Sequence, residues 1–213
     1  MARTRPYREQ TRRKVLDAAY TVFGERGIAG TSLEQVAAAA GLTKGAVYSN
    51  FRSKDELVLT LMEEHAADRI TRSLQALQDD LTPTQVAQQV GVVLAQEMRA
   101  DAGWHRLLAE YAALARRDPD GAEGLRRSRR EIRDAVAGVL DRLVETFPVT
   151  LPMPSADLAI VVLALGNGLA LESEIEPDGV RDDLFARVLG IIASDVVTVV
   201  SETAPAADDV AAG

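Results

Sequence analysis

The chain has 213 residues, of which 47% are hydrophobic, and a formal net charge of −8. These values exclude an intrinsically disordered chain, because enough apolar surface is present to build the core of one domain or of two small ones. The chain has no cysteine, which excludes disulfides and thiolate metal sites.

The charge is distributed unevenly along the chain. Residues 1–54 contain ten Lys and Arg against four Asp and Glu, a net charge of +6, whereas the remaining residues carry a net charge of −14. A basic segment joined to an acidic one can direct one end of a molecule toward phosphate groups while the other end is repelled. The N-terminal quarter is therefore a candidate nucleic-acid-binding segment, although the net charge alone argues against one.

The first predicted elements are a flexible basic arm and a helix. Residues 1–9 carry three arginines around Pro6. We interpret them either as an arm that contacts phosphates or a minor groove, or as a solvated terminus. No apolar segment follows, so we expect no signal peptide and a cytoplasmic protein. Helical spacing of apolar residues predicts a helix over residues 10–25, with Gly27 ending it.

Two short helices separated by a glycine-containing turn are predicted next. Ser32 and Gln35 have the spacing of a capping box, which starts a helix near Leu33, and Gly41 can end it in a left-handed turn. The hydroxyl of Thr43 can then cap a second helix. Two helices joined in this way cross at a steep angle, so the second can place its N-terminal end in a major groove of DNA.

The second helix carries side chains suited to a phosphate-rich surface. Its N-terminal dipole favours an anion beside Lys44, and Gly45 permits close backbone approach. Tyr48 lies one turn further on, and two cations follow it. We therefore predict DNA contacts by Ser32, Thr43, Lys44, Gly45, Tyr48, Arg52 and Lys54.

The segment TSLEQVAAAAGLTKGAVYSNFRSKDEL, preceded by TRRKVLDAAYTVFGERGIAG, resembles the DNA-binding domain of TetR-family transcriptional regulators. The similarity covers residues 11–61, including the Gly-Leu-Thr-Lys-Gly-x-x-Tyr-x-x-Phe core and the Ser-Lys-x-x-Leu that follows it. The resemblance implies an all-α fold of about nine helices, with an N-terminal three-helix helix-turn-helix domain and a C-terminal helical bundle. It also implies a homodimeric repressor whose effector lowers its affinity for an operator.

The remaining chain is predicted to be helical throughout. A long helix from residue 54 to about residue 80 would belong to both parts of the molecule and could carry a movement between them. Five more helices are predicted over residues 84–100, 103–117, 121–147, 156–174 and 180–200. We divide the chain into a DNA-binding domain, a ligand-binding and dimerisation domain, and a disordered tail: residues 1–53, 54–202 and 203–213.

Residues 156–172 are apolar on nearly every face of a helix, so both sides must be covered, either by the domain itself or by a partner chain. The most apolar part, residues 158–171, is too short to span a bilayer, and we expect no membrane association. In the TetR family the last two long helices form the dimer interface. By this resemblance we predict interface contacts by Ile160, Leu163, Ala164, Leu184, Val188 and Ile191.

Polar and aromatic residues of the second domain are candidates either for a ligand pocket or for an ordinary core. His65 and His105 are the only histidines, and the Glu-x-x-His spacing of helical metal sites is missing, so we expect no metal and no cofactor. Asn167 lies in an apolar segment and needs a hydrogen-bond partner. The predicted pocket residues are Met62, His65, Met98, Trp104, His105, Leu108, Tyr111 and Asn167.

The sequence therefore predicts a DNA-binding transcriptional regulator and not an enzyme. The resemblance implies a homodimeric repressor, bound to a palindromic double-stranded operator, and we expect a small apolar effector to release it. One alternative is a DNA-binding regulator with no ligand. The other is a helical-bundle enzyme, for which the basic N-terminal segment would be incidental.

Overall fold

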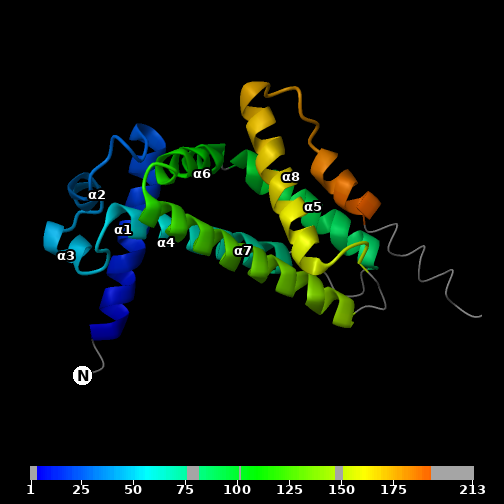
Figure 1. The fold of residues 1–213 in the computed structure, drawn as a ribbon, viewed down its shortest axis with the longest axis horizontal. Coiled ribbons are helices and arrows are strands. Elements are labelled where there is room, and N and C mark those ends of the chain that lie inside the picture. The colour runs from blue at the N-terminus through cyan, green and yellow to red at the C-terminus, as the bar shows by residue number, and fades with distance from the viewer. Residues whose placement is uncertain (1–3, 76–81, 101, 147–150, 193–213) are drawn as a thin grey trace, which may run out of the picture.

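The computed structural model describes residues 4–75, 82–100, 102–146 and 151–192. Within these ranges every regular element is a helix, so the predicted all-α fold is confirmed (Figure 1). A further helical segment covers residues 184–192. The predicted tail, residues 203–213, lies outside the described residues. The helices are α1 (Thr4–Arg26), α2 (Leu33–Ala39), α3 (Lys44–Tyr48), α4 (Lys54–Gln75), α5 (Pro83–Ala100), α6 (Ala102–Ala115), α7 (Pro119–Thr146) and α8 (Ser155–Ile175).

Helix α1 begins earlier than expected. It starts at Thr4, so most of the segment predicted to be a flexible arm is helical. Pro6 lies in the first turn of this helix, where a missing amide proton costs no hydrogen bond. The guanidinium of Arg8 donates to the carbonyl oxygen of Ser49 at 3.4 Å. The basic N-terminal turn is therefore held beside the end of α3.

The predicted caps of the helix-turn-helix are confirmed. The Ser32 hydroxyl accepts from the Gln35 amide at 3.3 Å, and the Gln35 side chain accepts from the Ser32 amide at 2.7 Å. Thr43 caps α3 by accepting from the Ala46 amide at 3.2 Å. Gly41, between the two helices, has φ 65°, a left-handed conformation that glycine adopts without strain.

Two later helix starts differ from the expectation. Asp118 accepts a hydrogen bond from the Gly121 amide at 2.8 Å, and Pro119 is the first residue of α7. Residues 118–121 therefore form a capped helix start, where proline is favoured, and the helix begins two residues before the predicted start at residue 121. Helix α8 begins at Ser155, one residue before the predicted start, and Pro154 occupies the cap position with no side chain capping the helix.

The head, α1–α3, lies at one end of the molecule, and the body, α4–α8 with residues 184–192, extends away from it (Figure 1). The long helices α4 and α7 run side by side in the same direction. Gly124 of α7 lies against Leu59 of α4. Burial raises the pKa of Glu63 on α4, and the nearby carboxylate of Glu131 on α7 raises it further. Helix α8 returns along α7 and crosses it at an angle.

One apolar core joins the head to the body. Its buried members include Phe23 and Val47 in the head and Trp104, Leu107 and Tyr111 on α6. The division at residue 53 therefore cuts through a continuous core. A second cluster, with Ala95, Phe185 and Leu189 at its centre, joins α5, α8 and the last helix at the far end of the body.

Helix α8 is long and apolar enough, by length and composition, to cross a membrane. The expectation that its apolar run is too short was therefore wrong, because the helix continues through Gly166 and Gly168. One of its faces packs on α5, α6 and α7. The other leaves apolar side chains exposed at helical spacing, which we call the α8 stripe: Ile160, Val161, Ala164, Leu171 and Ile175.

The close crossing of α5 and the last helix generates a first prediction. A Cβ atom on Gly91 would lie 2.5 Å from the Cα atom of Ala186, so Gly91→Ala must push two backbones apart. We expect a loss of about 1–3 kcal/mol in the free energy of unfolding, measured by urea denaturation. Gly138→Ala on α7 is the control, since its nearest neighbour is an arginine side chain at 3.8 Å. Equal stability of the two variants would contradict the crossing geometry.

Candidate functional site

The exposed face of α2 and α3 brings three predicted DNA contacts to one surface. Thr43 caps α3, Lys44 is its first residue, and Tyr48 ends it with 42% of its surface exposed. In this structure a carboxylate faces both of the latter side chains. Glu34 Oε1 lies 2.5 Å from the Lys44 ammonium and accepts a hydrogen bond from the Tyr48 hydroxyl at 3.4 Å.

The hydrogen bond from Lys44 holds the pKa of Glu34 at about 2, helped by its own backbone amide and by Ser32. The carboxylate therefore stays ionised at neutral pH. If DNA contacts this surface, a phosphate oxygen would compete with this carboxylate for Lys44 and Tyr48.

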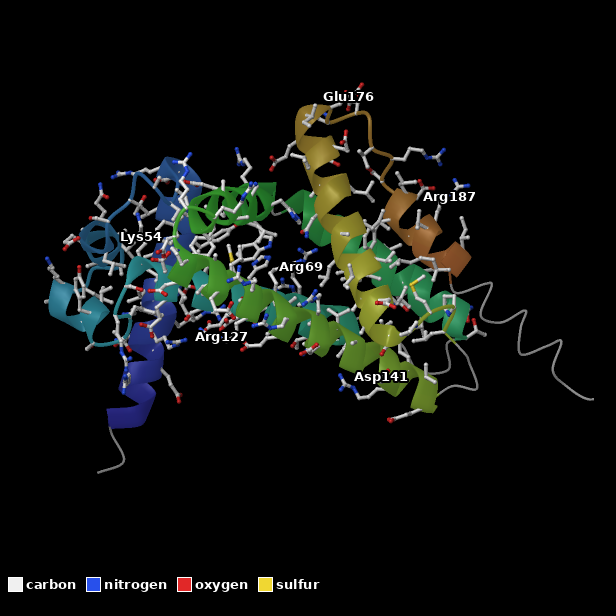
Figure 2. The ribbon with its side chains drawn as sticks, in the orientation of Figure 1. Lys54, Arg69, Arg127, Asp141, Glu176 and Arg187 are labelled. Atoms are coloured by element: carbon white, nitrogen blue, oxygen red, sulfur yellow. The ribbon has the colours of Figure 1, made fainter. Side chains whose placement is uncertain are left out.

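The other predicted DNA contacts are placed differently. Gly45 faces open space, since a Cβ atom there would meet nothing within 4 Å. Arg52 is exposed between α3 and α4, where its amide donates to Glu56 at 2.7 Å. The Lys54 ammonium turns inward and donates to the carbonyl oxygens of Ile28 and Thr31 at 2.7 and 3.0 Å (Figure 2). Lys54 thus holds the loop between α1 and α2 together, a role the sequence analysis did not foresee.

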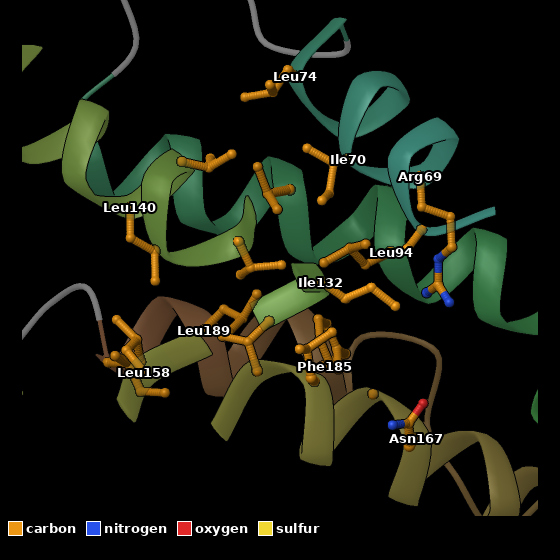
Figure 3. A pocket seen from close by; sticks show the side chains of 18 of the residues that line it. Arg69, Ile70, Leu74, Leu94, Ile132, Leu140, Leu158, Asn167, Phe185 and Leu189 are labelled. Atoms are coloured by element: carbon orange, nitrogen blue, oxygen red, sulfur yellow. The ribbon is translucent and has the colours of Figure 1, made fainter. Parts of the chain in front are cut away.

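The body contains a cavity of about 260 Å³ between its helices (Figure 3). Side chains from α4, α5, α6, α7, α8 and the last helix line it, and nearly all of them are aliphatic or aromatic. Apolar clefts with a few converging polar groups are the usual form of a small-molecule site. The polar members of the lining are His65, Arg69, His105, Arg129 and Asn167.

Five of the eight predicted pocket residues line this cavity: His65, Trp104, His105, Leu108 and Asn167. The structure corrects the prediction for Met62 and Tyr111, which are buried in the core shared by head and body. The Tyr111 hydroxyl donates to Asp55 at 3.1 Å instead of facing a ligand. The side chain of Met98 lies outside the described residues.

The sequence analysis missed several lining residues, including both arginines. Arg129 lies three residues before Ile132 and seven before Val136, so it falls on the same helix face as the apolar stripe of α7. The sequence alone could therefore have predicted that Arg129 faces the same side as these apolar residues. Phe185 was harder to find, because its place depends on how the last helix crosses α5 and α8.

A stack of three rings connects the cavity to the head. The His65 ring on α4 lies parallel to the Trp104 ring on α6, with centroids 3.8 Å apart. The His65 ring also lies nearly parallel to that of Tyr20 on α1, with centroids 6.5 Å apart. Two of the three rings line the cavity and the third belongs to the head. A group bound beside His65 or Trp104 would therefore contact the stack that ends on α1.

A second connection runs from α6 to the loop after α1. The two carboxylate oxygens of Glu110 accept hydrogen bonds from the amides of Ile28 and Ala29 at 3.0 and 2.9 Å. Gly27, just before them, has φ 75°, and a Cβ atom there would lie 3.1 Å from Glu110. The loop thus has both the conformation and the space that this contact needs.

The predicted dimer contacts divide into two groups. Leu163 lines the cavity, which corrects its assignment to the surface. The other five lie on α8 and the last helix, three exposed and two half-buried: Ile160, Ala164 and Ile191, and Leu184 and Val188.

Comparison with known proteins identifies the N-terminal segment. The family described as "Bacterial regulatory proteins, tetR family" matches residues 15–61. The transcriptional regulator TtgR of Pseudomonas putida is 31% identical over 107 residues, 49% of this chain and 50% of that protein. The A-factor receptor protein of Streptomyces griseus is 31% identical over 84% of this chain and 60% of that protein. The chain thus spans about half the length of TtgR.

Solved structures extend the similarity of fold to the body. Salmonella enterica GusR superposes with a TM-score of 0.66 at 20% identity, over 89% of this chain and 96% of that chain. A transcriptional regulator from Rhodococcus sp. Rha1 superposes with a TM-score of 0.63 at 23% identity, over 88% and 96% of the two chains. At these identities the similarity concerns the fold alone.

Gly45 provides a test of the α3 surface. Gly45→Ala fits the free protein without a clash and should raise its stability by up to about 1 kcal/mol, because alanine favours a helix. If DNA backbone approaches this position, the added methyl group should weaken DNA binding about tenfold or more. Thermal denaturation and fluorescence anisotropy measure the two effects. Unchanged DNA affinity would remove Gly45 from the interface.

Glu110 provides a test of the contact between body and head. Glu110→Ala removes both acceptors, so hydrogen exchange at the Ile28 and Ala29 amides should become faster, and stability should fall by about 1–3 kcal/mol. Glu110→Gln keeps one acceptor oxygen, so its exchange rates and its stability should lie between those of Glu110→Ala and the unmodified protein. Native-state exchange measured by NMR distinguishes these cases. Unaltered protection of both amides would show that other groups hold this loop.

Proposed function

Because the chain belongs to the TetR family of bacterial regulatory proteins, we propose that it is a repressor released from a palindromic DNA operator by a small apolar ligand. The observation that carries the proposal is the capped helix pair α2–α3, with the family match centred on it. The relatives named above as transcriptional regulators support a regulatory role and not an enzymatic one. We place the protein in the cytoplasm, where its operator would lie.

The charge distribution supports DNA binding at the head. The net charge of +6 over residues 1–54 attracts phosphate, while the acidic body is repelled from it. One further cation of the head lies close to α3. Arg8 at the start of α1 is fastened to the end of α3, beside the surface that carries Lys44.

The α8 stripe supports a homodimer. Its side chains include Ile160 at 45% exposure and Ile175 at 70% exposure, and Ile191 on the last helix is 65% exposed. Apolar side chains that recur on one helix face are costly to leave in water, and a second copy of the same face would cover them. A twofold dimer would place two α3 helices on successive turns of a palindromic operator.

The cavity supports regulation by a ligand over the alternative of a regulator with no effector. A ligand can change DNA affinity only if it binds two arrangements of the protein with different affinity. The ring stack and the Glu110 contact give the cavity wall two connections to the head. A typical coupling of about 1–3 kcal/mol would change operator affinity about 5- to 150-fold.

The test is binding to a palindrome-containing fragment from the DNA immediately upstream of the coding region, measured across a salt series. We expect two protomers per site and a steep decrease of affinity with salt. Lys44→Ala should weaken binding and reduce the salt slope by about 1, because one phosphate contact is lost.

The control variant is Arg126→Ala, another exposed cation paired with a carboxylate, but placed on α7 of the body. It should bind DNA as the unmodified protein does. Equal affinity of Lys44→Ala and unmodified protein at about 150 mM salt would refute the assignment of Lys44 to a phosphate contact.

A further inference from the structure

The charged side chains of the cavity are all of one sign. Arg69 of α4 and Arg129 of α7 line it, and no Asp or Glu is among the described residues that do. A guanidinium group at the wall of an otherwise apolar space is unusual, because a buried charge is costly unless a partner compensates it. The described part of the cavity wall carries no negative charge.

The polar groups gather toward one end of the cavity. On α7, Arg129 precedes the aliphatic lining residues from Ile132 to Leu143, and α7 runs away from the head. On α8, which returns along α7, the aliphatic Leu158 comes first and Asn167 later. Figure 3 shows Arg69 and Asn167 toward one side, opposite Leu140 and Leu158. The cavity thus has a polar end nearer the head and an apolar far end.

Arg129 is held in an unfavourable setting. It is half-buried, and among the described residues no carboxylate pairs with it. Burial lowers the pKa of its guanidinium, and repulsion from Arg133 lowers it further. An anion bound at this end of the cavity would offset both effects.

From this arrangement we propose that the effector is an apolar monocarboxylic acid. Its carboxylate binds between Arg69 and Arg129, with Asn167 as a further donor, and its hydrocarbon part lies along the aliphatic side chains toward Leu158. This assignment deepens the proposed function, since it names the ligand class of the same cavity. Guanidinium groups suit a carboxylate because they can donate two parallel hydrogen bonds to it.

The size of the cavity limits the length of the acid. A volume of about 260 Å³ holds roughly nine water-sized groups at about 30 Å³ each. A straight-chain acid of about eight carbon atoms matches this space. Octanoate is therefore the probe, with octanamide as a neutral compound of nearly the same shape and octylamine as a cationic one.

The experiment is isothermal titration of the full chain with the three probes at pH 7. We expect octanoate to bind at least tenfold more tightly than octanamide, because only the carboxylate brings a negative charge to the half-buried Arg129 guanidinium. Octylamine should bind most weakly, since its ammonium group would be repelled by both arginines. This comparison uses the unmodified protein and so does not depend on the folding of any variant.

Two variants then locate the carboxylate. Arg69→Met and Arg129→Met should each weaken octanoate about tenfold or more, while leaving octanamide within about twofold. Arg129→Met should also raise the melting temperature of the ligand-free protein, because it removes an uncompensated buried charge. The control is Arg127→Met, an exposed residue about 200° around α7 from Arg129. It should change neither quantity.

The outcomes separate this inference from the proposed function. Equal binding of octanoate and octanamide, or octanoate affinity unchanged in both arginine variants, would overturn the assignment of an acidic ligand and leave regulation by an apolar ligand intact. No binding of any octyl probe would overturn both statements about the cavity. Operator binding, measured separately, tests the DNA-binding part of the proposal whatever the cavity holds.

Discussion

The buried core that joins α1, α4 and α6 is the constraint on which the rest of the structure depends. Three short helices of about fifty residues bury too little surface to be robust alone. Here Trp104, Leu107 and Tyr111 of the body complete their core. Burial and the nearby Asp55 raise the pKa of Tyr111 well above its usual value, so the phenol stays protonated and keeps donating to Asp55. The head is therefore stable only in a defined position on the body.

The same arrangement explains how a cavity in the body could influence the surface that we propose binds DNA. The helices that complete the core of the head, α4 and α6, also form part of the cavity wall. A group that enters beside His65 or Trp104 and does not fit the existing space must shift α4 or α6. Since interiors are closely packed, even a small shift would change the seating of α1. The coupling proposed here needs no flexible linker.

The head could be predicted from the sequence because its determinants are local. The caps of α2 and α3 depend on pairs three residues apart, Ser32 with Gln35 and Thr43 with Ala46, and such pairs are visible in the chain. The inward turn of Lys54 was not visible, since it joins carbonyl groups more than twenty residues away. The cavity could be predicted only in part. Some of its lining residues fall on helix faces that the spacing of apolar residues predicts. Others depend on the close crossing of two helices at Gly91 and Ala186, which only packing determines.

The position of Trp104 has a practical consequence. It is the only tryptophan in the chain, and it lies in the wall between the cavity and the head, stacked on His65. The tryptophan fluorescence of this protein therefore comes from one indole at the junction of its two parts. A change in emission on adding a compound or DNA would report on that junction without a label, and a titration could be followed in the unmodified protein.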